Sequence, residues 1–205
     1  MRIHRVLGLW LAVLLAAGVG SPALRAASAT NTIIIGTTDR PTVLEPAMSY
    51  EFPGWWVIGR THDFLYNLDP RTERPVPALA TDYEVSEDGL TYTFHLRRGV
   101  TFTDGAPFNA EAVKFTFERN LKLNGDPVWL IQGIEEIRVV DPYTVQFVLS
   151  APDATFLQKL SFTAPAAILS PNTFTAATVQ ETQRTTDRTG TIGTGLYRIA
   201  QFVPD

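Results

Sequence analysis

The stretch PALATDYEVSEDGLTYTFHLRRGVTFTDG, residues 77–105, predicts a β-hairpin followed by a second turn. Tyr92, Phe94 and Leu96 alternate with polar neighbours, and this period of two is typical of a strand with one buried face. The segment EDG at 87–89 precedes this strand and supplies a glycine, which accepts the positive φ angle that tight turns use. We therefore expect a hairpin whose apolar face, Phe94 included, is buried.

A helix is predicted after the second turn. Asn109 is a favourable N-cap residue for a helix over 110–121, because its side-chain oxygen can accept a hydrogen bond from a free backbone N–H. Val113, Phe117 and Leu121 lie at positions i, i+4 and i+8, which places them on one side of a helix. We therefore expect this side to face the core.

Weaker signals lie on both sides of these elements. Towards the N-terminus we expect a strand at 31–38 buried on both faces, an ordered loop at 39–53, and a helix at 54–66 that Asp69-Pro70 ends. Towards the C-terminus we expect a hairpin at 134–149, a short helix at 153–160, a surface loop at 175–191 and a strand at 196–203. Strands and helices therefore mix along the chain, as in an α/β fold.

The first 29 residues have the order of a secretory signal. Two arginines precede an apolar run at 6–20, and Ala27-Ser28-Ala29 then supplies the small side chains of a cleavage site. The run is shorter than the ~20 residues that a membrane-spanning helix needs. We therefore expect cleavage before Thr30 and export, and the lack of cysteine excludes a lipoprotein anchor.

Composition excludes several classes of function. Without the first 29 residues the chain has 14 basic and 21 acidic residues, a net charge of −7, which gives no electrostatic footprint for nucleic acid. The absence of cysteine excludes disulfides, thiolate metal sites and a cysteine nucleophile. With 45% hydrophobic residues the chain is typical of a globular protein and not of a disordered tail.

Other candidate motifs have structural interpretations. Gly193 and Gly195 form a G-x-G without the third glycine of a dinucleotide site, so we interpret them as turn residues. His62 and His95 lack partners at metal-ligand spacing, and we expect neither to bind a metal. A secreted hydrolase that uses an acid such as Asp104 stays as an alternative, although no base lies at a suitable spacing.

Aromatic residues and one loop are the better candidates for a binding site. Aromatic rings at the edge of a cleft can stack on a ligand, although each ring could instead fill the core. The loop after the strand at 31–38 lies where α/β sheets bind ligands, beyond the carboxyl end of a strand. The candidate ligand-binding residues are Thr38, Asp39, Met48, Tyr50, Trp55 and Trp129.

The stretch at 77–105 also resembles one family, the peptide, dipeptide and nickel class of solute-binding proteins that serve ATP-binding-cassette (ABC) importers. Shorter segments resemble the same family in the same order: IGT at 35–37 with LEP at 44–46, AEAV at 110–113, VVD-YTV at 139–145 and GTGLY at 193–197. Departures such as Leu196, where the family usually has proline, change local geometry little. The resemblance spans residues 32–200.

The resemblance implies a fold and a function. The fold is that of a type II periplasmic binding protein, α/β with a mixed sheet, flanking helices and hairpins, of which this chain holds the first lobe only. Residues 1–29 would be the signal peptide and 30–205 the truncated amino-terminal lobe. The function implied is a periplasmic, non-enzymatic component, monomeric when full length and without a cofactor, that captures peptides and delivers them to permease subunits. A nickel, metallophore or other small-solute binder is the alternative.

Overall fold

The computed structural model describes residues 34–162, 164–176, 178, 180–182 and 190–203. The predicted signal peptide at 1–29 lies outside these residues, as does much of the loop predicted at 175–191. The chain divides into two units, Met1–Thr37 and Thr38–Asp205, and the fold below is that of the second unit. None of the helices in the part described is long and apolar enough to cross a membrane.

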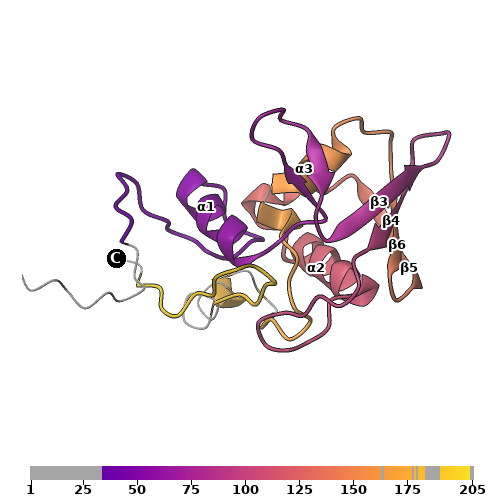
Figure 1. Ribbon diagram of the computed structural model, residues 1–205. Coiled ribbons are helices and arrows are strands. Elements are labelled where there is room, and N and C mark those ends of the chain that lie inside the picture. The colour runs from indigo at the N-terminus through magenta and orange to yellow at the C-terminus, as the bar shows by residue number, and fades with distance from the viewer. Residues whose placement is uncertain (1–33, 163, 177, 179, 183–189, 204–205) are drawn as a thin grey trace, which may run out of the picture. The chain divides into compact units, whose positions relative to one another are not determined.

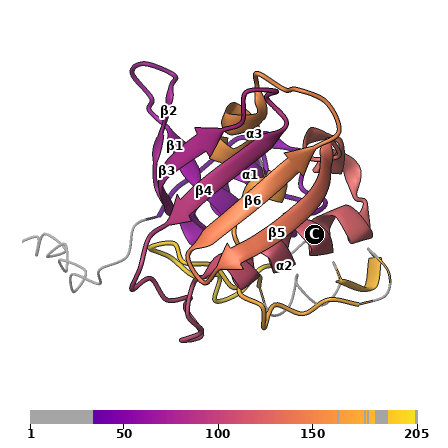
Figure 2. The same cartoon turned by 90° about the vertical axis from the view of Figure 1, so that its right-hand side faces the viewer.

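A four-stranded sheet is the largest element of the fold (Figure 1). It contains β3 (Ala80–Val85), β4 (Thr91–Leu96), β6 (Thr144–Leu149) and β5 (Ile134–Asp141), in that order and antiparallel throughout. Both hairpins predicted from the sequence are confirmed, and Gly89 has a φ of 70° in the β3–β4 turn. Figure 2 shows this sheet from its uncovered face, with the helices behind it.

On the central strand β4, the two faces of the sheet differ in burial in the way the alternation predicts. The side chains of Tyr92, Phe94 and Leu96 on β4 are buried, while those between them are half-buried. On the outer face, Gln146 Nε2 donates a hydrogen bond of 3.0 Å to Thr93 Oγ1 on the neighbouring strand. An antiparallel sheet with one apolar and one polar face requires a layer on its apolar face only.

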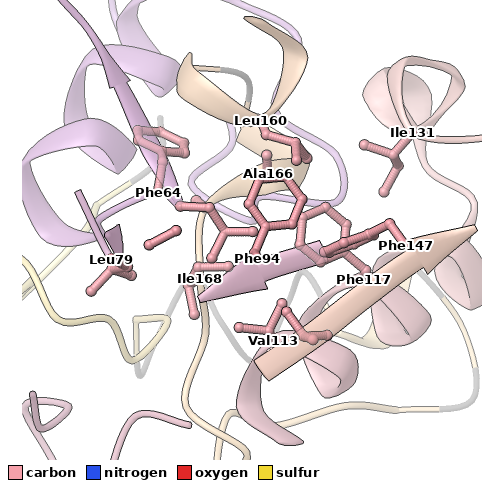
Figure 3. Close-up of a cluster of buried hydrophobic side chains, with 14 of the residues drawn as sticks. Phe64, Leu79, Phe94, Val113, Phe117, Ile131, Phe147, Leu160, Ala166 and Ile168 are labelled. Carbon is pink, nitrogen blue, oxygen red and sulfur yellow. The ribbon is translucent and has the colours of Figure 1, made fainter. Parts of the chain in front are cut away.

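Helix α2 (Ala110–Leu123) covers that apolar face (Figure 1). The predicted N-cap is confirmed, since Asn109 Oδ1 accepts a hydrogen bond of 3.0 Å from the Ala112 N–H. The ring of Phe117 lies edge-on to that of Phe147 on β6, with 4.9 Å between the centroids. Figure 3 shows these rings in the core beside Phe94 and Val113.

The remaining elements complete the fold. They are α1 (Phe52–Thr61), the strand pair β1 (Tyr66–Leu68) and β2 (Pro75–Pro77), η1 (Asp126–Leu130), α3 (Phe156–Phe162) and η2 (Ala164–Ala166). The predicted end of α1 at Asp69-Pro70 is wrong. The helix stops at Thr61 because His62 takes an extended backbone (φ −131°, ψ 152°) and buries its side chain.

Two predicted strands are not formed in the residues that the structure describes, which exclude 31–33. Residues 34–37 form no strand, and Ile34 is 91% exposed. Residues 196–203 form none either, and Leu196 is 96% exposed. Both segments have β-branched or aromatic composition, but a strand also requires a neighbour to bond with its backbone. Among the residues described, no strand pairs with either segment.

Candidate functional site

Three of the six predicted site residues form one aromatic cluster, which consists of Tyr50, Trp55 and Trp129. The Tyr50 ring lies edge-on to Trp55, with centroids 6.0 Å apart, and edge-on to Trp129, with centroids 6.4 Å apart. Tyr50 is 56% exposed and Trp129 is 53% exposed, whereas Trp55 is half-buried. Rings with this much open surface can contact a solute.

The loop that precedes α1 holds Trp55 in place. The indole N–H of Trp55 donates a hydrogen bond to the Ser49 carbonyl oxygen at 2.5 Å. The Glu51 carboxylate accepts hydrogen bonds from Thr42 Oγ1 at 3.0 Å and from the Val43 N–H at 3.2 Å, which ties the preceding loop to the helix. The loop at 42–51 is therefore ordered by its own side chains.

A buried ion pair anchors the same loop to α2. Arg119 Nη1 and Nη2 donate to the two carboxylate oxygens of Glu45 at 2.8 and 2.9 Å, and both side chains are excluded from water. Arg119 also donates to Thr175 Oγ1 at 2.8 Å and to the Phe174 carbonyl at 3.1 Å. Paired charges with their hydrogen bonds satisfied can stay buried, whereas a single one could not.

A glycine lets the loop approach η1, which carries Trp129. A Cβ atom on Gly125 would lie 2.0 Å from the Ala47 carbonyl oxygen and 3.1 Å from the Met48 side chain. Met48, the fourth predicted site residue, is half-buried at this contact with Gly125. Close backbone approach at Gly125 therefore brings residues from two distant segments together.

The other two predicted residues are placed differently. Thr38 and Asp39 lie in an exposed segment and take no part in the ring contacts that define the aromatic cluster. Sequence reasoning placed them at the carboxyl end of the strand predicted at 31–38, and residues 34–37 form no such strand. Sequence reasoning also missed Glu45 and Arg119 as a pair, because nothing in the sequence connects positions so far apart.

The two glycines of the G-x-G lie close to the backbone at the end of α1. A Cβ on Gly193 would lie 2.3 Å from the Thr61 carbonyl oxygen, and the Gly195 N–H donates to the same oxygen at 3.1 Å. Thr194 Oγ1 donates to Asp63 at 2.8 Å. The motif thus packs on the end of α1.

His62 lies under this motif and is 1% exposed. Its Nδ1 is 2.8 Å from Thr61 Oγ1, while its Nε2 has no hydrogen-bond partner among the residues described. Burial lowers the pKa of His62 to about 4; the Ile58 carbonyl opposes this shift and the Arg119 charge adds to it. The imidazole is therefore neutral at ordinary pH.

Asp104 is unsuited to the role of general acid. Its carboxylate accepts hydrogen bonds from the Ala106 N–H, Ser170 Oγ and Asn172 Nδ2 at 2.8–3.0 Å. Partial burial acts to raise the pKa of Asp104, but these hydrogen bonds outweigh it and the pKa lies below its ordinary value. A general acid needs a raised pKa instead.

A separate hollow of about 370 Å³ lies beside the G-x-G segment. It is lined by Thr103, Thr191, Ile192, Arg198, Ile199 and Ala200. None of the six predicted site residues lines it. The aromatic cluster therefore stays the candidate site.

Comparison with known proteins identifies the family. The model for bacterial extracellular solute-binding proteins, family 5 Middle, matches residues 74–205. The chain belongs to this family. The match includes the hairpin of β3 and β4, and it confirms the resemblance that the hairpin sequence carries.

Two curated relatives agree with the match. The chain is 34% identical over 165 residues to the peptide transport periplasmic protein SapA of Salmonella typhimurium, covering 71% of this chain and 30% of SapA. It is 38% identical over 180 residues to the dipeptide-binding protein of Escherichia coli, covering 75% and 33%. The chain thus spans about a third of the length of the curated relatives it matches.

The fold matches solved structures as well. The periplasmic binding protein DppA of Helicobacter pylori, in complex with the peptide STSA, aligns with a TM-score of 0.65 and 28% identity. The alignment covers 80% of this chain and 36% of that structure. The expected fold class, that of a periplasmic binding protein of type II with only part of it present in this chain, is confirmed.

Proposed function

We propose that the chain is part of the periplasmic solute-binding component of an ABC importer, which captures di- and oligopeptides and delivers them to the permease subunits. Residues 30–205 are the amino-terminal lobe, released as a non-lipidated protein when the signal peptide at 1–29 is cleaved before Thr30. The full-length protein acts as a monomer, without a cofactor and without catalysis. SapA and the dipeptide-binding protein, both named for peptides, support this choice.

The observation that best supports the proposal is the aromatic cluster. Tyr50 and Trp129 present open ring surface, and the loop behind them is fixed by the buried pair of Glu45 and Arg119. Rings contact many kinds of side chain with little loss of conformational entropy, since they have two rotatable side-chain bonds. A rigid aromatic wall therefore suits a carrier that accepts peptides of varied sequence. We propose that Thr38, Asp39 and Met48 contact the ligand beside this wall.

Calorimetric titration of the full-length protein with di- and tripeptides tests the proposal. We expect micromolar binding, and about tenfold weaker binding in Trp129→Leu because a ring contact is lost. Tyr143→Leu is the matched control, since this ring lies on the β5–β6 turn outside the aromatic cluster. Thermal midpoints of both variants show whether they are folded.

Three results would contradict the proposal. These are binding of nickel or a nickel chelate and of no peptide, the same affinity in Trp129→Leu as in the wild type, and turnover of chromogenic esters or peptides. The first would favour the alternative of a nickel or metallophore binder. The last would favour the alternative of a secreted hydrolase, for which the lowered pKa of Asp104 is unsuitable.

A further inference from the structure

A carboxylate lies on the same side of η1 as Trp129. Asp126 and Trp129 are three residues apart in this 3₁₀-helix, which has about three residues per turn, so their side chains are eclipsed. Asp126 is exposed. Within the part of the chain that the structure describes, its side chain has no ion pair or hydrogen bond.

The other charged groups on the segments that form the aromatic cluster have partners. Glu45 is paired with Arg119 in the interior, and the Glu51 carboxylate is bonded to Thr42 and Val43. The Arg60 guanidinium lies over the Trp56 ring, 5.6 Å from its centroid. Asp126 is thus the available acid beside the open rings. Lys122, exposed in the last turn of α2, forms no ion pair with it among the residues described.

Open aromatic faces and a free carboxylate attract the same kind of group. The face of an aromatic ring carries negative electrostatic potential, so ammonium and guanidinium groups bind over Trp and Tyr. A carboxylate within a few ångströms adds Coulombic attraction, which is weakened by salt when the groups are exposed. Neutral and acidic solutes gain nothing from the carboxylate.

We infer that the aromatic cluster, together with Asp126, selects solutes that carry a positive charge, namely peptides with lysine or arginine side chains. This inference rests on the proposed function and narrows the substrate class of the same site. The cationic group lies over the Tyr50 or Trp129 ring and next to the Asp126 carboxylate. Peptide backbone contacts come from elsewhere and do not depend on charge.

Three tripeptides that differ in one side chain test the inference on the full-length protein. Alanyl-lysyl-alanine is compared by calorimetry with its norleucine analogue, which keeps the four side-chain carbons and lacks the ammonium group, and with alanyl-glutamyl-alanine. We expect the lysine peptide to bind about tenfold tighter than the norleucine peptide and the glutamate peptide to bind weakest. Higher salt reduces the ratio.

The variant Asp126→Asn tests whether the Asp126 carboxylate causes the preference for the lysine peptide. We expect it to reduce the lysine-to-norleucine affinity ratio from about tenfold to two- or threefold. Glu135→Gln, which removes an exposed acid on β5, is the matched control and keeps the ratio. Thermal midpoints check that the helix end survives, since an acid in the first turn also favours the helix dipole.

The outcomes separate this inference from the proposed function. Binding of all three peptides with equal affinity, a preference for glutamate, or an unchanged ratio in Asp126→Asn overturns the charge selection and leaves peptide binding in place. Failure of every tripeptide to bind overturns both.

Discussion

His62 is a neutral base kept out of water by the segment that contains Gly193. Its pKa is lowered from 6.5 to about 4 in the folded chain, so the unfolded chain binds the proton more tightly. The contribution of the neutral His62 to the free energy of unfolding is therefore fully present above about pH 6.5, and it decreases as the pH falls towards 4. The full loss is about 3 kcal/mol.

Urea unfolding between pH 7 and pH 4.5 measures most of this loss before most carboxylates titrate. We expect the free energy of unfolding to fall steadily over this range in the wild type and to change much less in His62→Gln. The same pH dependence in both proteins would show that another group is responsible.

The ion pair between Glu45 and Arg119 is buried, so its two charges depend on each other. Arg119→Met leaves the Glu45 carboxylate buried without its partner, and we expect a loss of about 3–5 kcal/mol in the free energy of unfolding. The double variant Glu45→Leu/Arg119→Met removes both charges and should recover much of that loss. Chemical denaturation measures both, and a double variant no more stable than Arg119→Met would contradict the argument.

Gly125 allows the loop before α1 to pack closely against the start of η1. Its backbone (φ −77°, ψ 178°) suits alanine, so the predicted effect of Gly125→Ala comes only from the clash with the Ala47 carbonyl. We expect a loss of about 1–3 kcal/mol in stability and a weaker peptide affinity, because η1 must move and Trp129 moves with it. Gly133→Ala, with nothing within 4 Å of the added Cβ, is the control for denaturation and calorimetry.

The sequence predicts those helices and strands that have local signals. Both hairpins follow from alternation, and α2 from its cap and apolar stripe, because these signals are local. Even there, Leu121 of the predicted stripe is only half-buried, while Leu123 is buried. The strands predicted at 31–38 and 196–203 required a partner strand, and no local pattern reports whether one is present.

The candidate site was predictable in its residue types and not in its geometry. Aromatic residues at 50, 55 and 129 were notable for their type, but their contact depends on close approach at Gly125 and on the buried ion pair. Asp126 was missed because its place beside Trp129 depends on a 3₁₀-helix, which the sequence analysis did not predict.

The family resemblance implies a second lobe that closes on the ligand, and the chain spans about a third of the length of its relatives. We predict that a polypeptide of residues 30–205 binds tripeptides only in the millimolar range or not detectably, against micromolar affinity for the full-length protein. One wall gives a fraction of the contacts, while the peptide loses the same translational and rotational freedom as it does between two.

Exposed apolar side chains add a further expectation for that polypeptide. Leu196, Tyr197 and Val203 are largely exposed, and apolar surface of this kind promotes association. Calorimetry gives the affinity, and light scattering during gel filtration gives the mass. The expectation that tight binding needs both lobes would be contradicted by one result. This is a polypeptide of residues 30–205 that is monomeric, unfolds cooperatively and binds tripeptides with micromolar affinity, because the aromatic cluster alone would then supply enough contact to retain a peptide.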